Sequence, residues 1–144
     1  MSEQSLKNHG RYIPLWHFIM PLAILAFMIG SVINLFDCLH KEDALYSASL
    51  LVMLGPMLLF IWFYARSFAL KAQDRGIRAE ENLRHFILTG KPLDPRLRTY
   101  QIVALRFAPD AEFVELANKA ANENMKPKEI KMAIQNWRGD YHRV

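Results

Sequence analysis

The 144-residue sequence has a single cysteine, Cys38, and two long stretches without Asp, Glu, Lys or Arg. One cysteine cannot form an internal disulfide bond, so a small disulfide-stabilised scaffold is excluded. The uncharged stretches are residues 12–36 and 44–65. A domain of this size cannot bury two such segments in one core, so a single soluble globular domain is excluded as well.

The sequence also lacks the short motifs of common enzyme and metal sites. It has no H-E-x-x-H, Walker, G-x-S-x-G or dinucleotide-binding glycine pattern, and one cysteine cannot form C-x-x-C. Glu81 and His85 are four residues apart, whereas di-iron bundles use Glu-x-x-His at a spacing of three. We therefore predict no catalytic, cofactor-binding or metal-binding residues and no enzymatic activity.

Each uncharged stretch has the length of a membrane-spanning helix. A helix rises about 1.5 Å per residue, so about 20 apolar residues cross a bilayer core of roughly 30 Å. We predict transmembrane helices at residues 15–36 and 44–65, joined by an external loop at residues 37–43; the alternative is a pair of buried soluble helices. The first stretch is too long for a signal peptide and has no A-x-A-like cleavage site, so we expect it to be retained.

Charge sets the predicted orientation, because Lys and Arg are retained on the cytoplasmic side of a membrane. The loop has a formal charge of −2, whereas the predicted cytoplasmic segment 1–14 carries Lys7 and Arg11. Four basic residues follow the second span: Arg66, Lys71, Arg75 and Arg78. Aromatic side chains that favour the interface mark the inner ends of the spans: Tyr12, Trp16, Trp62 and Tyr64. We therefore place both termini in the cytoplasm.

Small and polar residues recur inside the spans, at Ala26, Gly30 and Asn34 in the first and at Ser47 and Gly55 in the second. Small residues let membrane helices approach closely, and an amide side chain can hydrogen-bond to a neighbouring helix. These residues predict either the contact between the two helices or a docking face for another membrane protein.

Residues 66–88 are predicted to continue the second helix as a cytoplasmic stalk, because they contain no proline and many helix-forming residues. Apolar residues at spacings of three or four are expected to form one narrow stripe along this helix. The stripe consists of Phe68, Ala72, Gly76, Ala79, Leu83 and Phe86. Glu80–Arg84 and Glu81–His85 are expected to be exposed pairs.

Residues 89–144 are predicted to form a small cytoplasmic module of short helices. Thr99 is expected to cap a helix over residues 100–107, and a last helix should run from Pro127 to about Tyr141. The predicted packing residues of this module are Phe113, Leu116, Ile130, Ile134, Trp137 and Tyr141. The predicted fold is thus all-α: a transmembrane helical hairpin whose second helix extends into a small cytoplasmic helical module.

Residues 66–144 hold 15 of the 18 Lys and Arg and carry a net charge of +5. Anionic lipid headgroups attract such residues near a membrane by about 1 kcal/mol each. Arg66, Lys71, Arg75 and Arg78 are therefore the candidate lipid-binding residues. Nucleic-acid binding needs a denser basic patch with exposed aromatics, and we do not expect it. The expected partners are the lipid bilayer and a membrane protein, or further copies of the chain.

Four segments make the chain resemble a family of small, uncharacterised bacterial two-span membrane proteins, known only as a domain of unknown function. These segments are KNHGRYIPLWHF, ARSFALKAQDRGIRAEENLR, IVALRFAPDAEF and IKMAIQNWRGDYHRV. The resemblance covers nearly the whole chain. It implies a bacterial source and implies that hairpin and module form one unit, but it implies no activity, cofactor or functional residue.

The function expected from the sequence is that of a non-catalytic accessory or adaptor protein. It would be anchored in the bacterial inner membrane and dock on a larger membrane complex. The first alternative is a sensor that binds anionic lipid. The second is an enzyme acting on a membrane substrate, which would need a polar pocket between stalk and module.

Overall fold

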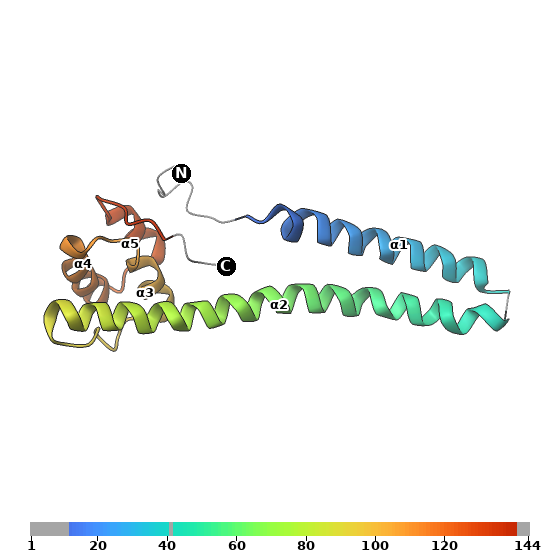
Figure 1. Ribbon diagram of the computed structural model, residues 1–144, viewed down its shortest axis with the longest axis horizontal. Helices are drawn as coiled ribbons and strands as arrows, with labels where there is room; N and C mark the ends of the chain where they lie inside the picture. The colour runs from blue at the N-terminus through green and yellow to red at the C-terminus, as the bar shows by residue number, and fades with distance from the viewer. Residues whose placement is uncertain (1–11, 41, 141–144) are drawn as a thin grey trace. The chain divides into compact units, whose positions relative to one another are not determined.

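The computed structural model describes residues 12–40 and 42–140. All regular elements in these ranges are helices (Figure 1), so the expected all-α class is confirmed for the described residues. Two compact units can be distinguished, one within Arg11–Phe68 and one within Ala69–Val144. We call them the hairpin unit and the C-terminal unit; helix α2, Glu42–Thr89, contributes to both.

The hairpin unit consists of a π-helical turn η1 (Leu15–Ile19), α1 (Met20–Cys38) and the first part of α2. Pro21 is the second residue of α1, which follows directly on the π-helical turn, so it has no N–H to donate to that turn. The two helices lie antiparallel (Figure 1) and approach closely at Gly55. A Cβ atom at Gly55 would lie 2.6 Å from Cγ of Met28, so only glycine fits without a shift of that side chain.

Apolar side chains of the hairpin unit point outward. Only 11% of the most apolar 18-residue window of either helix is buried. The large exposed side chains include Phe18, Leu22, Ile29, Phe36, Tyr46, Met53, Phe60 and Ile61. Both helices are long and apolar enough to cross a membrane. The core helices of a soluble protein are mostly buried, whereas these two helices are mostly exposed in the described residues.

The C-terminal unit combines the last part of α2 with three short helices: α3 (Thr99–Leu105), α4 (Asp110–Glu123) and α5 (Pro127–Ala133). Helix α3 packs against both α4 and α5. Their apolar faces form one buried core with Phe107, Phe113, Leu105 and Ile130 among its least exposed side chains. The core therefore lies between the short helices rather than along α2.

The helix ends of the C-terminal unit are held by specific polar contacts. The buried Gln101 side chain accepts a hydrogen bond from the Arg98 N–H at 2.8 Å and donates one to the Met125 carbonyl at 2.9 Å. Helix α4 ends at Glu123, and the capping residue Asn124 adopts the left-handed conformation with φ of 49°. The Lys126 N–H, just before α5, donates to the Glu129 carboxylate at 2.7 Å.

Two predicted helix boundaries are wrong. Thr99 is the first residue of α3 and not its cap, which is Arg98. The last helix ends at Ala133 instead of near Tyr141, because tertiary contacts take the N–H groups that a longer helix would use. The Glu112 carboxylate accepts from the N–H groups of Gln135 and Asn136, and the Phe107 carbonyl accepts from the Arg138 N–H.

The predicted apolar stripe of α2 does not face the short helices. Ala72, Gly76, Ala79, Leu83 and Phe86 are all exposed. The buried residues on this part of α2 are instead Ile77, Glu81 and His85, on the opposite side of the helix. The C-terminal unit is therefore built on the more polar face of α2, and the apolar stripe stays at the surface.

Candidate functional site

A largely buried arginine side chain, that of Arg84, joins α2 to the start of α4. The Arg84 guanidinium donates to Asp110 Oδ1 at 2.6 Å, to Glu81 Oε2 at 2.9 Å and to the Ala108 carbonyl at 2.8 Å. It also lies 4.3 Å from the centre of the Phe113 ring, in cation–π geometry. The side chains of Arg84 and Glu81 are only 12% and 9% exposed. Arg84 therefore forms this pair with Glu81, not the predicted exposed pair with Glu80.

The loop after α2 is fixed by three polar side chains of that helix. Nδ1 of His85 lies 2.8 Å from the Lys91 carbonyl, and the ring packs edge-on against Phe113. The Thr89 hydroxyl donates to the His85 carbonyl at 2.8 Å, and Asn82 Oδ1 accepts from the Leu93 N–H at 2.9 Å. Further along the loop, hydrogen bonds from Arg96 lower the pKa of Asp94 to about 2.

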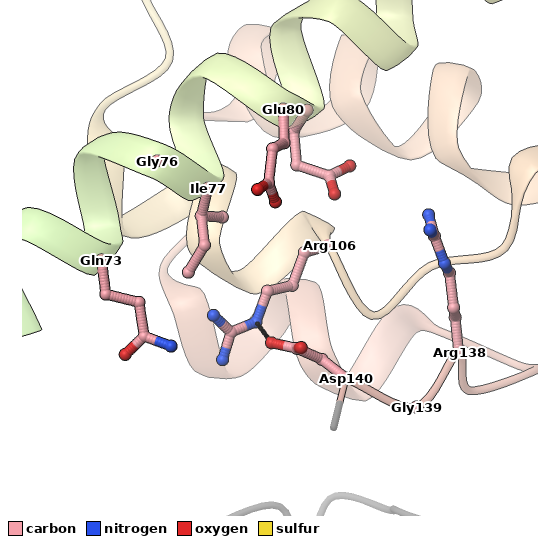
Figure 2. A pocket seen from close by; sticks show the side chains of 9 residues that line it. Gln73, Gly76, Ile77, Glu80, Arg106, Arg138, Gly139 and Asp140 are labelled. Atoms are coloured by element: carbon pink, nitrogen blue, oxygen red, sulfur yellow. Dashed lines mark ion pairs between the residues drawn. The ribbon is translucent and has the colours of Figure 1, made fainter. Parts of the chain in front are cut away.

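A polar cavity of about 610 Å³ lies beside these contacts, between α2, the end of α3 and the segment that follows α5 (Figure 2). Its lining residues are Gln73, Gly76, Ile77, Glu80, Glu81, Arg106, Arg138, Gly139 and Asp140. In Figure 2 Glu80 lies on α2 at one side of the cavity and Arg138 lies at the opposite side. We call this space the polar cavity.

Most charge in the polar cavity is balanced within the protein. Nε of the buried Arg106 lies 3.2 Å from Asp140 Oδ2, and its guanidinium lies 4.6 Å from the centre of the Phe107 ring. Glu81 is held by Arg84. Glu80 and Arg138 are exposed at the rim. The arrangement therefore offers a carboxylate and a guanidinium to a ligand that carries both charges, rather than a free base beside a nucleophile.

The described residues contain no group of three His, Cys, Asp or Glu side chains placed to hold a metal ion. Cys38 lies at the end of α1, where its thiol is 3.9 Å from Asn34 Oδ1.

The predicted lipid-binding residues do not share one face. Lys71, Arg75 and Arg78 are exposed and lie on the same side of α2, because their spacings are four and three. Arg66 is half-buried, and its five-residue spacing from Lys71 places it on another side. Arg75 and Arg78 also line a smaller cavity of about 310 Å³ next to Asp94.

The small residues of the two spans separate into two groups. Gly55 is buried against Met28, whereas Ala26, Gly30, Asn34 and Ser47 are exposed. A Cβ atom at Gly30 would have no described atom within 4 Å outside its own helix turn. The hairpin contact on α1 is made by another face, which includes the buried Ile24 and Ser31. The prediction that the Ala26–Gly30–Asn34 stripe packs on the second helix is therefore wrong, and its alternative as a docking face stays a prediction.

The predicted interface aromatics all lie in the hairpin unit. The rings of Trp16 and Trp62 stack with centres 6.3 Å apart, and the Trp62 indole donates to the Trp16 carbonyl at 3.0 Å. Tyr12 packs edge-on against His17. Tyr64 stacks on Phe68.

The predicted packing residues of the C-terminal unit lie in its core. Phe113, Leu116, Ile130 and Ile134 are buried, and Trp137 packs against them from the edge, 5.0 Å from the Phe107 ring. Tyr141 lies outside the described residues.

Sequence reasoning missed Glu81, Arg84, Glu112, Arg106 and Asp140 as structural residues. The spacing of Ile77, Glu81, Arg84 and His85 follows a helix face, yet three of these side chains are polar. A search for apolar periodicity cannot find such a face.

The chain belongs to the family described as "Family of unknown function (DUF6526)", whose model matches residues 1–144. The resemblance to an uncharacterised family is therefore confirmed. Searches of curated proteins and of solved structures returned no match.

Proposed function

We propose that this protein is a non-catalytic, membrane-anchored adaptor of the bacterial inner membrane. Its hairpin unit would span the bilayer with both termini in the cytoplasm, and its C-terminal unit would be a cytoplasmic module. The protein would dock on a larger membrane complex. The outward-facing stripe of Ala26, Gly30 and Asn34 on α1 is the observation that carries the docking role.

The outward apolar side chains of the hairpin unit support the membrane anchor. Burial of one large apolar side chain stabilises a protein by about 1.5–3 kcal/mol relative to its exposure to water. More than ten such side chains are exposed here, so water is an unfavourable environment for this unit. Lipid removes the cost, and the closed hydrogen bonding of the two helices suits a medium without polar partners.

Charge supports the orientation. The basic residues Lys71, Arg75 and Arg78 follow the apolar part of α2 and are exposed. The other end of the hairpin lies near Cys38, whose side chain is half-exposed. A membrane-impermeant maleimide should therefore label Cys38 in intact spheroplasts. Protection of Cys38 until lysis would contradict the proposed orientation.

The stripe on α1 supports docking because the hairpin does not use it. Small side chains let another helix approach, and Asn34 offers an amide that can hydrogen-bond to that helix. Large side chains such as Leu22 and Ile33 flank the stripe and are themselves exposed. This surface combines small side chains with exposed apolar neighbours, which suits a transmembrane helix of another protein.

Photo-crosslinking in native membranes tests the adaptor role. A photoreactive residue at Ala26 should give a specific adduct with another membrane protein. The same residue at Val32, which is exposed on a different face of α1, is the matched control. Gly30→Leu should abolish the adduct and leave the hairpin intact. Recovery of monomer alone from mild detergent, with no adduct specific to Ala26, would overturn the proposal.

Binding of anionic lipid is a second candidate function, supported by the common face of Lys71, Arg75 and Arg78. Replacing all three by Glu should reduce the anionic lipid that copurifies with the full chain. Replacing Lys119, Lys126 and Lys128 by Glu is the control with the same charge change. Equal lipid content in both variants would contradict a specific lipid site.

An enzyme acting on a membrane substrate is the third candidate, and the polar cavity supplies the space that it needs. Two of the three cavity carboxylates, Glu81 and Asp140, are paired with Arg84 and Arg106. A paired carboxylate is a weak general base, so the adaptor role ranks above catalysis. A small molecule that copurifies with the chain and is lost in Arg138→Ala would reverse this order.

A further inference from the structure

One face of α2 in the C-terminal unit has apolar residues in a strict seven-residue pattern. Ala72, Gly76, Ala79, Leu83 and Phe86 follow one another at spacings of four, three, four and three. All five are exposed, and the two large ones, Leu83 and Phe86, are 59% and 53% exposed. Alternation of three and four is the spacing of a coiled-coil seam, where two helices bury a narrow apolar stripe against each other. We call these five residues the seam.

The opposite face of the same helix is already occupied. Ile77, Glu81, Arg84 and His85 contact the rest of the C-terminal unit and are buried or nearly so. With 100° per residue, their mean direction on the helix is roughly opposite to that of the seam. The core between α3, α4 and α5 is complete without the seam. Within the described residues Leu83 and Phe86 stay exposed, and Gly76 lies at the edge of the polar cavity, so a partner can reach the stripe from the solvent side.

The heptad register identifies the residues that flank the seam. Gly76 and Leu83 occupy a positions, and Ala72, Ala79 and Phe86 occupy d positions. Arg75 is then a g residue, and Glu80 is the e residue of the following heptad. Both side chains are exposed. In a parallel two-stranded coiled coil, a g residue faces the e residue five positions later on the partner helix, where opposite charges attract.

We infer that the segment of α2 from residue 72 to 86 pairs with the same segment of a second copy of this chain in a parallel coiled coil. Arg75 of each copy then faces Glu80 of the other, so one helix carries both halves of a complementary pair. Antiparallel pairing would instead place g opposite g and e opposite e, which loses this match. The inference is independent of the proposed adaptor role, because the partner is the chain itself and the surface is not the stripe on α1.

The composition of the seam determines what kind of dimer to expect. Ala72, Gly76 and Ala79 allow close approach of the two helices, whereas Leu83 and Phe86 provide the larger apolar contact. The seam covers about two heptads, and a free-standing coiled coil usually needs three to four. The dimer should therefore form at high local concentration, as in a vesicle membrane, and dissociate on dilution.

Cysteine crosslinking of the full chain tests the seam. The native thiol is removed by Cys38→Ser, and Ala79→Cys is introduced into that background at a d position. Arg78→Cys is the matched control, because it is the adjacent exposed residue and points away from the seam. In reconstituted vesicles at several protein-to-lipid ratios, Ala79→Cys should give severalfold more disulfide-linked dimer than Arg78→Cys. Equal crosslinking of the two variants would overturn the inference.

A charge exchange tests the parallel register. Arg75→Glu and Glu80→Arg should each reduce the Ala79→Cys dimer, because each places like charges opposite each other. The combination of both substitutions should restore the dimer, since the pair is then present with its signs reversed. Circular dichroism shows whether the variants keep their helices. Folded variants in which the combination is no better than either single substitution would exclude the proposed pairing.

Discussion

The hairpin unit and the C-terminal unit are both made of helices, yet they place their apolar side chains in opposite directions. In the hairpin unit Phe60 and Ile61 face outward, and small residues such as Ala48 and Gly55 are buried. In the C-terminal unit Phe107 and Phe113 are fully buried, and the small apolar stripe on α2 stays exposed. The two units thus differ in the distribution of side-chain size and polarity around their helices.

The largest expected effect comes from the core of the C-terminal unit. Phe107→Ala removes a fully buried ring and should destabilise this unit by about 3–5 kcal/mol. A core of this size provides too little stability to remain folded after such a loss, so the C-terminal unit should unfold. Limited proteolysis in vesicles should then cut within residues 90–140 and spare the hairpin. Phe60→Ala is the contrasting control, because that ring is 62% exposed and faces outward. Equal protease resistance of the two variants would contradict the comparison.

Loss of Arg84 should have the next largest effect. Arg84→Ala leaves the buried Glu81 carboxylate without its guanidinium, and breaking such a pair costs about 3 kcal/mol or more. Adding Glu81→Gln should recover part of the stability, because the unpaired charge is removed. The measurement is denaturant unfolding of the full chain in detergent, with the exposed Arg78→Ala as the control. If the double variant is less stable than Arg84→Ala, charge pairing is not the reason for the loss.

Substitutions at the two glycines of the hairpin unit should have smaller effects on stability, and these effects should differ clearly between the two positions. A side chain at Gly55 collides with Met28, so Gly55→Leu should cost about 1–3 kcal/mol through overpacking. Gly30→Leu meets open space and should leave the hairpin unchanged. Near-ultraviolet circular dichroism of the stacked Trp16 and Trp62 rings reports on the hairpin. A change in this signal for Gly30→Leu and none for Gly55→Leu would reverse our assignment of the contact face.

The all-α class and the two apolar helices could be predicted because they depend on composition and local spacing. The face of α2 that carries the C-terminal unit could not, because its contacts are made by Glu81, Arg84 and His85. Whether these polar side chains stabilise the fold depends on hydrogen-bond partners such as Asp110, which lie far along the chain. The early end of α5 has the same origin. Residues 134–140 do not continue the helix, because the Glu112 carboxylate accepts hydrogen bonds from two backbone N–H groups in this segment.

The Glu112 contact leads to the smallest predicted effect, a dependence of stability on pH. Hydrogen bonds from the Gln135 N–H and from Asn136 lower the pKa of Glu112 below its ordinary value of 4.5. A carboxyl group whose pKa is lower in the folded state stabilises the fold above its unfolded pKa. This contribution is lost as the pH falls below about 4.5 and through the lowered folded value.

Glu112→Gln isolates this contribution, because glutamine keeps an acceptor oxygen but does not titrate in this range. The stability difference between the unmodified chain and Glu112→Gln should be constant above pH 4.5 and shrink toward acid. Only the difference is informative, since Asp94, with its pKa lowered to about 2, loses charge in acid in both chains. Thermal unfolding across this pH range measures it, with Glu115→Gln on the same helix as the control. If the difference grows as the pH falls, the carboxylate does not hold the segment after α5 in the way described, and the end of that helix needs another cause.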